Sequence, residues 1–492
     1  MLFNSPEFLL IFLPITFIGF SFLAFYSSSA VTLWLAFASI VFYAYWSIDD
    51  VPILLISIFL NYTFANIIIK TTVRNVAGGL LVLAICLNLS MLGYFKYAQM
   101  AIEAVSLLGF NIDARKVMLP IGISFYTFTQ IAFLVDAYRG MVHEISLIKY
   151  VLFVTYFPHL IAGPILHHKE MIQQFQAYSL KSEKIAVGLT FFFIGLFKKV
   201  VLADSAAVWA QPVFAAPDVS AFEAWAAALM YAFQIYFDFS GYCDMAIGIS
   251  YCFGIVLPLN FNSPYKATSI VDFWRRWHIT LSRFLKDYLY VPLGGNRCGS
   301  MRRYINLFAT MIIGGLWHGA GWNFIVWGAL HGTFLIINHV WINISIKLGV
   351  SSNATWRSVL GGPLTFASVV IAWVFFKAET IDQAIRLLKS MFFANGILPS
   401  GWLDRVLSVL HAPQNLLFQP WLQGSLLLLL LGSVCWLLPN TQIYMRRHFA
   451  AINCSGHLFW TASLPNALLI ALLAVTSFVL MGGYSPFLYF QF

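Results

Sequence analysis

The chain has 492 residues, of which 60% are hydrophobic, 17% are aromatic and only 10% are charged, and its formal net charge is +9. A soluble protein carries about 25% charged residues, so this chain has too few charges to cover several water-exposed domains, and its composition excludes a soluble multidomain enzyme, a disordered chain and a disulfide scaffold. We therefore expect an all-α, polytopic integral membrane protein. The basic residues are spread between apolar runs, which favours cytoplasmic loops over nucleic-acid binding.

Apolar segments of helical length follow one another along the whole chain. They cover residues 6–24, 30–48, 51–69, 78–98, 118–136, 148–166, 184–203, 222–236, 245–259, 304–317, 322–344, 364–376, 422–438 and 464–481. A spanning helix needs about 20 apolar residues, so we expect about 11–13 true crossings, with the shorter segments re-entrant or buried. These helices form a single membrane-embedded domain over residues 1–492. The first segment lacks a basic leader and a cleavage site, so we do not interpret it as a signal peptide.

Two aspartates, Asp238 and Asp244, lie in apolar sequence near the middle of the chain. They are six residues apart, which is about 240° around a helix, so they do not form a paired-carboxylate catalytic site. We expect both to make hydrogen bonds within the helix bundle.

Residues 265–303 form a basic segment. Only Asp272 and Asp287 oppose its eight basic residues, Lys266, Arg275, Arg276, Arg283, Lys286, Arg297, Arg302 and Arg303. By the positive-inside rule this segment faces the cytoplasm. On a continuous helix Trp274, His278 and Ser282 share one face, with the two arginines Arg275 and Arg276 beside them. This pattern suits an anionic, phosphate-bearing ligand, and the alternative is a loop that rests on lipid headgroups.

His278, His318 and His331 lie in or beside apolar, aromatic-rich sequence. Ionisable residues in membrane segments are costly and are functional candidates by default, and histidine is the usual general base for an alcohol acceptor. The alternative for each is a packed histidine whose ring nitrogens bond to backbone or water.

Around His318, four glycines allow close approach of backbone or ligand: Gly314, Gly315, Gly319 and Gly321. Trp317 and Trp322 supply apolar walls. On one continuous helix His318 and His331 are about 140° apart, so only one of them faces a central cavity, and the glycines favour His318.

Signatures of soluble enzymes are missing from the sequence. It contains no G-x-S-x-G motif, P-loop, H-E-x-x-H motif or dinucleotide-binding fingerprint, and its six cysteines form no C-x-x-C pair. We expect neither a metal nor a bound cofactor. General-base chemistry without a metal is the kind of catalysis that remains.

Several runs resemble the membrane-bound O-acyltransferase family, and more narrowly its bacterial alginate O-acetyltransferase branch. They are YFDFSGYCDMA at 236–246, DFWRRWHITLS at 272–282 and GGLWHG at 314–319, together with LPIGISFY at 119–126, FPHLIAGP at 157–164, LYVPLGGNR at 289–297 and YSPFLYFQF at 484–492. The runs occur in the family's order and extend nearly from end to end.

The resemblance implies a ring of membrane helices around a thinned centre with a tunnel. It places the family's catalytic histidine on His318 and a second tunnel histidine on His278. Acetyl-CoA or a similar thioester would enter from the cytoplasm, with Arg275, Arg276 and Trp274 on the donor side. The acetyl group would then cross a bacterial inner membrane toward a polysaccharide such as alginate, through a periplasmic acetyltransferase partner.

Two departures from the branch pattern leave the polymer open. His167 and His168 stand where an Arg-Phe pair is usual, and Cys243 replaces a serine. Peptidoglycan or cellulose is the alternative acceptor. Two other hypotheses are a transporter or flippase of an acyl or saccharide carrier, against which the lack of a visible repeat counts, and a scaffold for a secretion complex.

Overall fold

The computed structural model describes residues 1–106, 109, 118–144, 146–176, 178, 180–349, 355–399, 420–447, 459–482 and 485–488. In these ranges the chain forms helices and loops and no β-strand, which confirms the all-α prediction. Seven helices of the described ranges are long and apolar enough to cross a membrane, and two shorter apolar helices accompany them. The expected total of about 11–13 crossings stays a prediction. Most of the terminal run at 484–492 lies outside the described residues.

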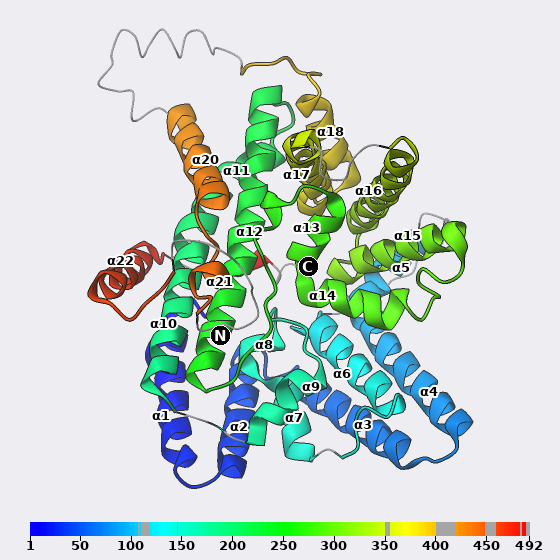
Figure 1. Cartoon of the computed structure of the whole chain (residues 1–492), viewed down its shortest axis with the longest axis vertical. Coiled ribbons are helices and arrows are strands. Elements are labelled where there is room, and N and C mark those ends of the chain that lie inside the picture. Colours follow the sequence, from blue (N-terminus) through cyan, green and yellow to red (C-terminus); the bar gives the residue numbers. More distant parts are fainter. Residues whose placement is uncertain are drawn as a thin grey trace.

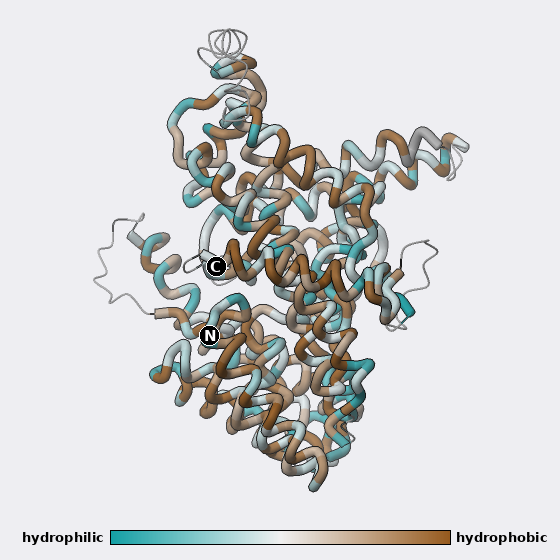
Figure 2. Tube along the Cα trace, turned by 90° about the vertical axis from the view of Figure 1, so that its left-hand side faces the viewer, coloured by the Kyte–Doolittle hydropathy of each residue, from teal (hydrophilic) through white to brown (hydrophobic). Residues whose placement is uncertain are grey.

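The N-terminal helices occupy the lower part of the molecule in Figure 1, except for the last of them, residues 98–106, which lies at mid-height. They are α1 (Leu13–Ala24), α2 (Ser28–Trp46), α3 (Val51–Lys70), α4 (Arg74–Leu92) and α5 (Ala98–Ser106), with a π turn, η2 (Gly93–Tyr97), between α4 and α5. Large apolar side chains on their outer faces, such as Ile18, Phe22 and Phe59, are mostly exposed. In Figure 2 much of the tube in the lower part of the molecule has the colour of hydrophobic residues. Such exposure suits contact with lipid and is unusual in a soluble monomer.

Helices from the middle of the chain pack on this layer and continue upward. They are α6 (Ile123–Tyr138), α7 (Leu147–Thr155), α8 (Phe157–Leu160), α9 (His168–Met171), α10 (Ser182–Phe197), α11 (Asp204–Ala215) and α12 (Ala221–Cys252). The expected crossing at 148–166 is instead two short helices, α7 and α8, because the Tyr156 backbone leaves the helical region before Pro158.

Helix α12 runs through the centre of the molecule (Figure 1) and is buried along most of its length. It merges the expected segment 222–236 with the first half of 245–259 into one helix of 32 residues, and residues 253–259 lie beyond its end. A reciprocal capping box between Ser220 and Glu223 starts it. Helix α10 packs against it so closely that a Cβ on Gly195 would lie 2.5 Å from the Gly241 carbonyl oxygen. Small residues at this contact let two membrane helices approach at backbone distance.

The remaining helices carry the basic segment and the C-terminal part. They are α13 (Ile270–Arg276), α14 (Ile279–Leu285), the π turn η6 (Lys286–Tyr290), α15 (Gly299–His318), α16 (Trp322–Lys347), α17 (Thr355–Lys377), α18 (Ile381–Met391), α20 (Pro420–Leu437), α21 (Thr441–Tyr444) and α22 (Leu464–Leu480). In Figure 1 helices α13, α14 and α15 lie between the N-terminal helices below and α17 and α18 above.

The two aspartates of α12 make the hydrogen bonds within the bundle that we predicted. Asp244 accepts from Lys198 at 2.6 Å and from the side chains of α21. Asp238 accepts from Lys199 at 2.8 Å and from the backbone N–H of Leu488. Because each carboxylate is paired with a lysine, these charges hold the π turn that follows α10 (Lys198–Ala203) and the C-terminal segment against α12.

Candidate active site

His318 is the last residue of α15, and the chain turns sharply after it. Gly319 is extended, with φ −162° and ψ 153°, and α16 begins at Trp322. His318 and His331 therefore lie on two helices, as the separate apolar segments 304–317 and 322–344 predicted, and the angle of about 140° between them on one continuous helix does not apply. The two helices pack so closely that a Cβ added to Gly315 would lie 2.2 Å from the Phe324 carbonyl oxygen. The glycines thus permit a tight hairpin that holds His318 at its bend.

His278 lies between α13 and α14 in a left-handed backbone conformation, with φ 42° and ψ 54°. Helical spacing therefore does not hold across it, and the predicted shared face of Trp274, His278 and Ser282 is wrong. A non-glycine residue at positive φ is uncommon and is seen often at functional sites. The imidazole is completely buried, whereas Trp274 and Ser282 line a cavity whose lining does not include His278.

Asn260 sets the orientation of the His278 ring. Its Oδ1 accepts from the backbone N–H of Thr280 at 3.2 Å and lies 3.1 Å from His278 Nδ1. Because a backbone N–H only donates, this Asn260 atom is the carbonyl oxygen, and His278 Nδ1 must carry the proton. Nε2 is then the basic nitrogen of the ring.

The two histidines come together in an aromatic enclosure. Their ring centroids are 6.4 Å apart, and Trp317 packs against both. Trp327 and Phe376 close the other side of His318 at 5.0 and 5.2 Å. The prediction that Trp322 forms a wall of the site is wrong, because it is 51% exposed at the start of α16.

Burial changes the proton affinity of both imidazoles, which lie outside the seven candidate spans. It lowers the pKa of His278 to about 3. Burial, followed by the charges on His278, Lys96 and His331, lowers the pKa of His318 well below its usual value. Both rings are therefore neutral at physiological pH, which is the state that a general base requires.

His331 lies deeper in the aromatic core than the other two. Its ring packs against Phe273, Trp274 and Trp327, with a centroid distance of 4.7 Å to the last. In the described part of the chain neither of its ring nitrogens has a hydrogen-bond partner. His331 is therefore packed among aromatic rings without the backbone hydrogen bonds that the packed-histidine alternative expected, and His278 and His318 are the two histidines whose rings lie beside Trp317.

A polar cavity of about 130 Å³ reaches His318 from the start of α6. Its lining includes the side chains of Lys96, Ser124, Trp317 and His318 and the backbone around Gly122. Lys96 is only 7% exposed. It lies in the apolar run at 78–98, where a lone lysine was a usable sequence signal that we did not interpret.

A second cavity, of about 290 Å³, lies among α13, α14, α15 and α16. Trp274, Arg275, Lys286 and Thr310 line it, so two cations and an aromatic ring face the same space. Arg276 is not among its lining residues, and its guanidinium instead pairs with Asp272 at 2.9 Å. The second cavity thus contains two of the three residues predicted on the donor side, and it adds Lys286.

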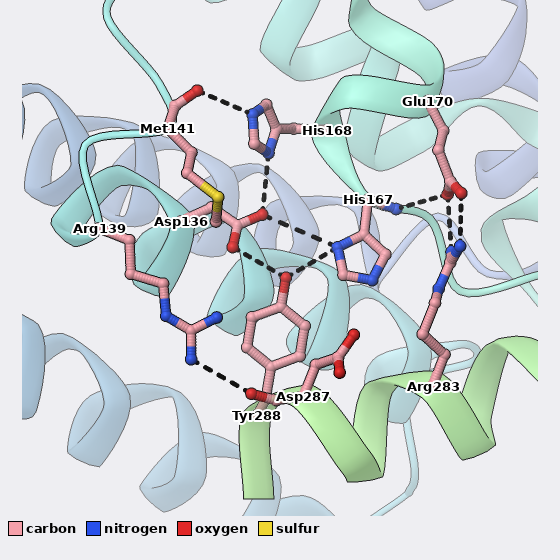
Figure 3. Close-up of polar contacts among 9 residues, drawn as sticks. All are labelled: Asp136, Arg139, Met141, His167, His168, Glu170, Arg283, Asp287 and Tyr288. Atoms are coloured by element: carbon pink, nitrogen blue, oxygen red, sulfur yellow. Dashed lines mark hydrogen bonds and ion pairs between the residues drawn. The ribbon is translucent and has the colours of Figure 1, made fainter. Parts of the chain in front are cut away.

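A polar network holds the segment that follows His278. Figure 3 shows Asp136 at its centre, with His168 Nδ1 2.9 Å away and the Tyr288 hydroxyl donating to the same carboxylate. Arg283 of α14 makes a two-pronged ion pair with Glu170 of α9. The network therefore ties α14 and η6 to α6 and α9. It also gives the unusual His167–His168 pair a structural role.

No group of three or more His, Cys, Asp or Glu side chains suited to a metal occurs in the ranges that the structure describes. Sequence reasoning missed two residues of the site, Asn260 and Lys96. No spacing rule links Asn260 to His278, because their contact depends on a loop that folds back between α12 and α13.

Comparison with known proteins gives matches over the whole chain. Residues 40–350 match the model of MBOAT, the membrane-bound O-acyltransferase family. The chain is 39% identical to a peptidoglycan O-acetyltransferase of Helicobacter pylori, over 100% of this chain and 98% of that protein. It is 38% identical to a probable alginate O-acetylase AlgI of Pseudomonas putida, over 100% of both chains. The corresponding protein of Pseudomonas aeruginosa is 42% identical over 80% of this chain and 75% of its own length.

Proposed function

Because the chain belongs to the membrane-bound O-acyltransferase family, we propose that it moves acetyl groups from a cytoplasmic thioester, acetyl-CoA or a relative of it, across a bacterial inner membrane for O-acetylation of an extracellular polysaccharide. The observation that carries this proposal is the buried His278–His318 pair, with the polar cavity at His318 and a second cavity lined by Trp274, Arg275 and Lys286.

The second cavity supports a phosphate-bearing donor. Arg275 and Lys286 face it together, and Trp274 offers an apolar surface beside them. Guanidinium and ammonium groups bind phosphate oxygens through charge-assisted hydrogen bonds. The Arg276 guanidinium already forms an ion pair with Asp272. In this proposal Arg275 and Lys286 therefore bind the donor's phosphates, and Arg276 contributes less to donor binding.

The histidine pair supplies the acid–base chemistry. His318 takes the proton of the acceptor hydroxyl as the oxygen attacks the thioester carbonyl, a C–O bond forms, the C–S bond breaks, and the proton leaves with the thiol. His278 assists through its basic Nε2, whose position Asn260 fixes. The aromatic enclosure of Trp317 and Trp327 excludes the water that would hydrolyse the thioester.

The two cavities meet α15 at different heights. The second cavity contacts it at Met311 and the polar cavity at His318, seven residues further along. Seven residues correspond to about 10 Å of helix. An acetyl group that passes His318 therefore has a short path, which supports transfer through the protein to a periplasmic acetyltransferase partner.

The acceptor is either alginate or peptidoglycan. Relatives named for these two acceptors match the full chain at 38% and 39% identity, so identity does not separate them. The His167–His168 pair in place of the branch's usual residues keeps peptidoglycan as the second candidate.

Purified protein incubated with radiolabelled acetyl-CoA tests the donor side. We expect thioester cleavage by the wild type and a KM for the donor that is about 10- to 100-fold higher in Arg275→Ala/Lys286→Ala, since a charge-assisted hydrogen bond contributes about 1.5–3 kcal/mol. Arg276→Ala is the matched control and should change KM less. Movement of the label across a vesicle without cleavage would instead indicate a carrier. An unchanged KM in the double variant would contradict the donor site.

A further inference from the structure

Lys96 is a buried cation that a local change of helix geometry places in the core. Helix α4 continues as the π turn η2, which carries Lys96 and Tyr97, before α5 begins. Such turns are rare and are frequent at functional sites. Lys198 and Lys199 pair with aspartates, whereas no carboxylate of the described residues forms an ion pair with Lys96. Burying an ammonium group at this depth without a counter-ion costs free energy, so the contacts that compensate for this cost identify its role.

Those contacts are all hydrogen bonds that the ammonium group donates. Nζ lies 2.6 Å from the carbonyl oxygen of Trp317, 3.2 Å from that of His318 and 3.2 Å from Ser124 Oγ. A lysine has three N–H donors, and these three acceptors use all of them. Lys96 is therefore engaged with the protein and acts on substrate only through its neighbours.

Two of these acceptors belong to the end of α15. The last carbonyls of a helix lack partners within the helix and carry its negative dipole end. The Tyr97 hydroxyl donates to the carbonyl of Leu316 at 2.7 Å, so η2 caps three consecutive carbonyls, those of Leu316, Trp317 and His318. A cation placed there stabilises the turn that presents the His318 imidazole.

We propose that Lys96 is a positioning residue of the acyl-transfer site: its hydrogen bonds fix the C-terminal turn of α15, and its charge adds to the effect of burial in opposing protonation of the His318 imidazole. The expected effect of Lys96 on acetyl transfer rests on the proposed function. Its effect on the stability of the end of α15 rests on the hydrogen bonds alone. A positive charge beside His318 opposes protonation of the ring. The other charged or titratable neighbours of His318 are His278 and His331, and both remain in every variant below.

Hydrogen–deuterium exchange measures how firmly Lys96 holds the end of α15, and the measurement does not depend on acetyl transfer. In Lys96→Met we expect the amides around residues 316–321 to exchange at least about tenfold faster than in the wild type, because the cap opens more often. Lys70→Met is the matched control, since Lys70 lies exposed in the last turn of α3. Lys96→Arg keeps the charge and should restore part of the protection.

The pH dependence of acetyl transfer measures the effect of the Lys96 charge on protonation of His318. Lys96→Met should lower the transfer rate about 10- to 100-fold through misplacement of the base. With the neighbouring positive charge gone, His318 protonates more readily, so the acid limb of the kcat/KM profile should move about one unit to higher pH. Tyr97→Phe removes an uncharged cap and should loosen α15 without moving that limb.

Two results would overturn the proposal. One is exchange in Lys96→Met that equals exchange in Lys70→Met. The other is an acid limb that stays in place while Lys96→Met and Tyr97→Phe lose activity alike, which would make Lys96 a structural cap only. If the wild type transferred no acetyl group but Lys96→Met still loosened α15, the proposed function would fail and the positioning role would stand.

Discussion

At the scale of single residues, the site depends on how each imidazole is held. His278 is held by a side chain, through the hydrogen bond to Asn260 Oδ1, and His318 by the end of its own helix. Asn260 also accepts from the backbone and hydroxyl of Thr280. One amide oxygen therefore fixes both the left-handed turn at His278 and the tautomer of its ring.

Asn260→Leu should lower acetyl transfer about tenfold, because it removes the acceptor that selects the Nδ1–H tautomer of His278. It leaves a buried N–H group without its partner, so the free energy of unfolding should fall by about 1–3 kcal/mol. Asn260→Asp keeps an oxygen acceptor and should retain more activity. Transfer rates normalised to the folded fraction are the measurement, and equal rates in both variants and the wild type would show that Asn260 does not orient His278.

The sequence singled out His278 and His318 as candidates but did not predict how their rings meet. His278 and His318 stood out because ionisable groups are rare in apolar sequence, and the structure brings their rings together. The spacing arguments failed because they assumed helices that continue through His278 and His318, whereas the backbone breaks at both. A residue such as Asn260 acts through a loop contact, and a single sequence carries no signal for it.

At the scale of elements, the hairpin of α15 and α16 determines where His318 points. The helices meet at Gly315 and Gly328, with backbone atoms in contact. Close contact of small residues is a usual way for membrane helices to pack. The glycine cluster was thus correctly interpreted as a site of close approach, with a helix rather than a ligand as the approaching group.

Gly315→Ala should therefore separate the two helices and reduce both stability and transfer. The added Cβ would lie 2.2 Å from the Phe324 carbonyl oxygen, and such overpacking costs about 1–3 kcal/mol. Gly79→Ala in α4 is the control, because a Cβ there meets no atom within 4 Å. Thermal unfolding in detergent should show a lower Tm for Gly315→Ala only. A Tm equal to that of Gly79→Ala would contradict the tight hairpin.

At the scale of the whole molecule, the fold class followed from composition, because 10% charged residues cannot cover a soluble chain of this size. The individual membrane crossings were predicted less well from the apolar runs of the sequence. The apolar run 222–236 and the part of 245–259 up to Cys252 belong to one central buried helix, and hydropathy does not distinguish a helix that faces lipid from one that faces protein. The cytoplasmic side stays a prediction from the basic segment at 265–303, of which Arg275 and Lys286 line the second cavity.

The central claim is that His318, held at the bend between α15 and α16, is the base that moves the acetyl group. The direct measurement is acetyl transfer from radiolabelled acetyl-CoA by purified His318→Ala, beside the wild type and His143→Ala, an exposed histidine between α6 and α7. Loss of a general base costs about 10²- to 10⁴-fold, so His318→Ala should fall by at least about 100-fold while it elutes and unfolds like the wild type. His143→Ala should keep the full rate. Wild-type transfer by folded His318→Ala would contradict the account.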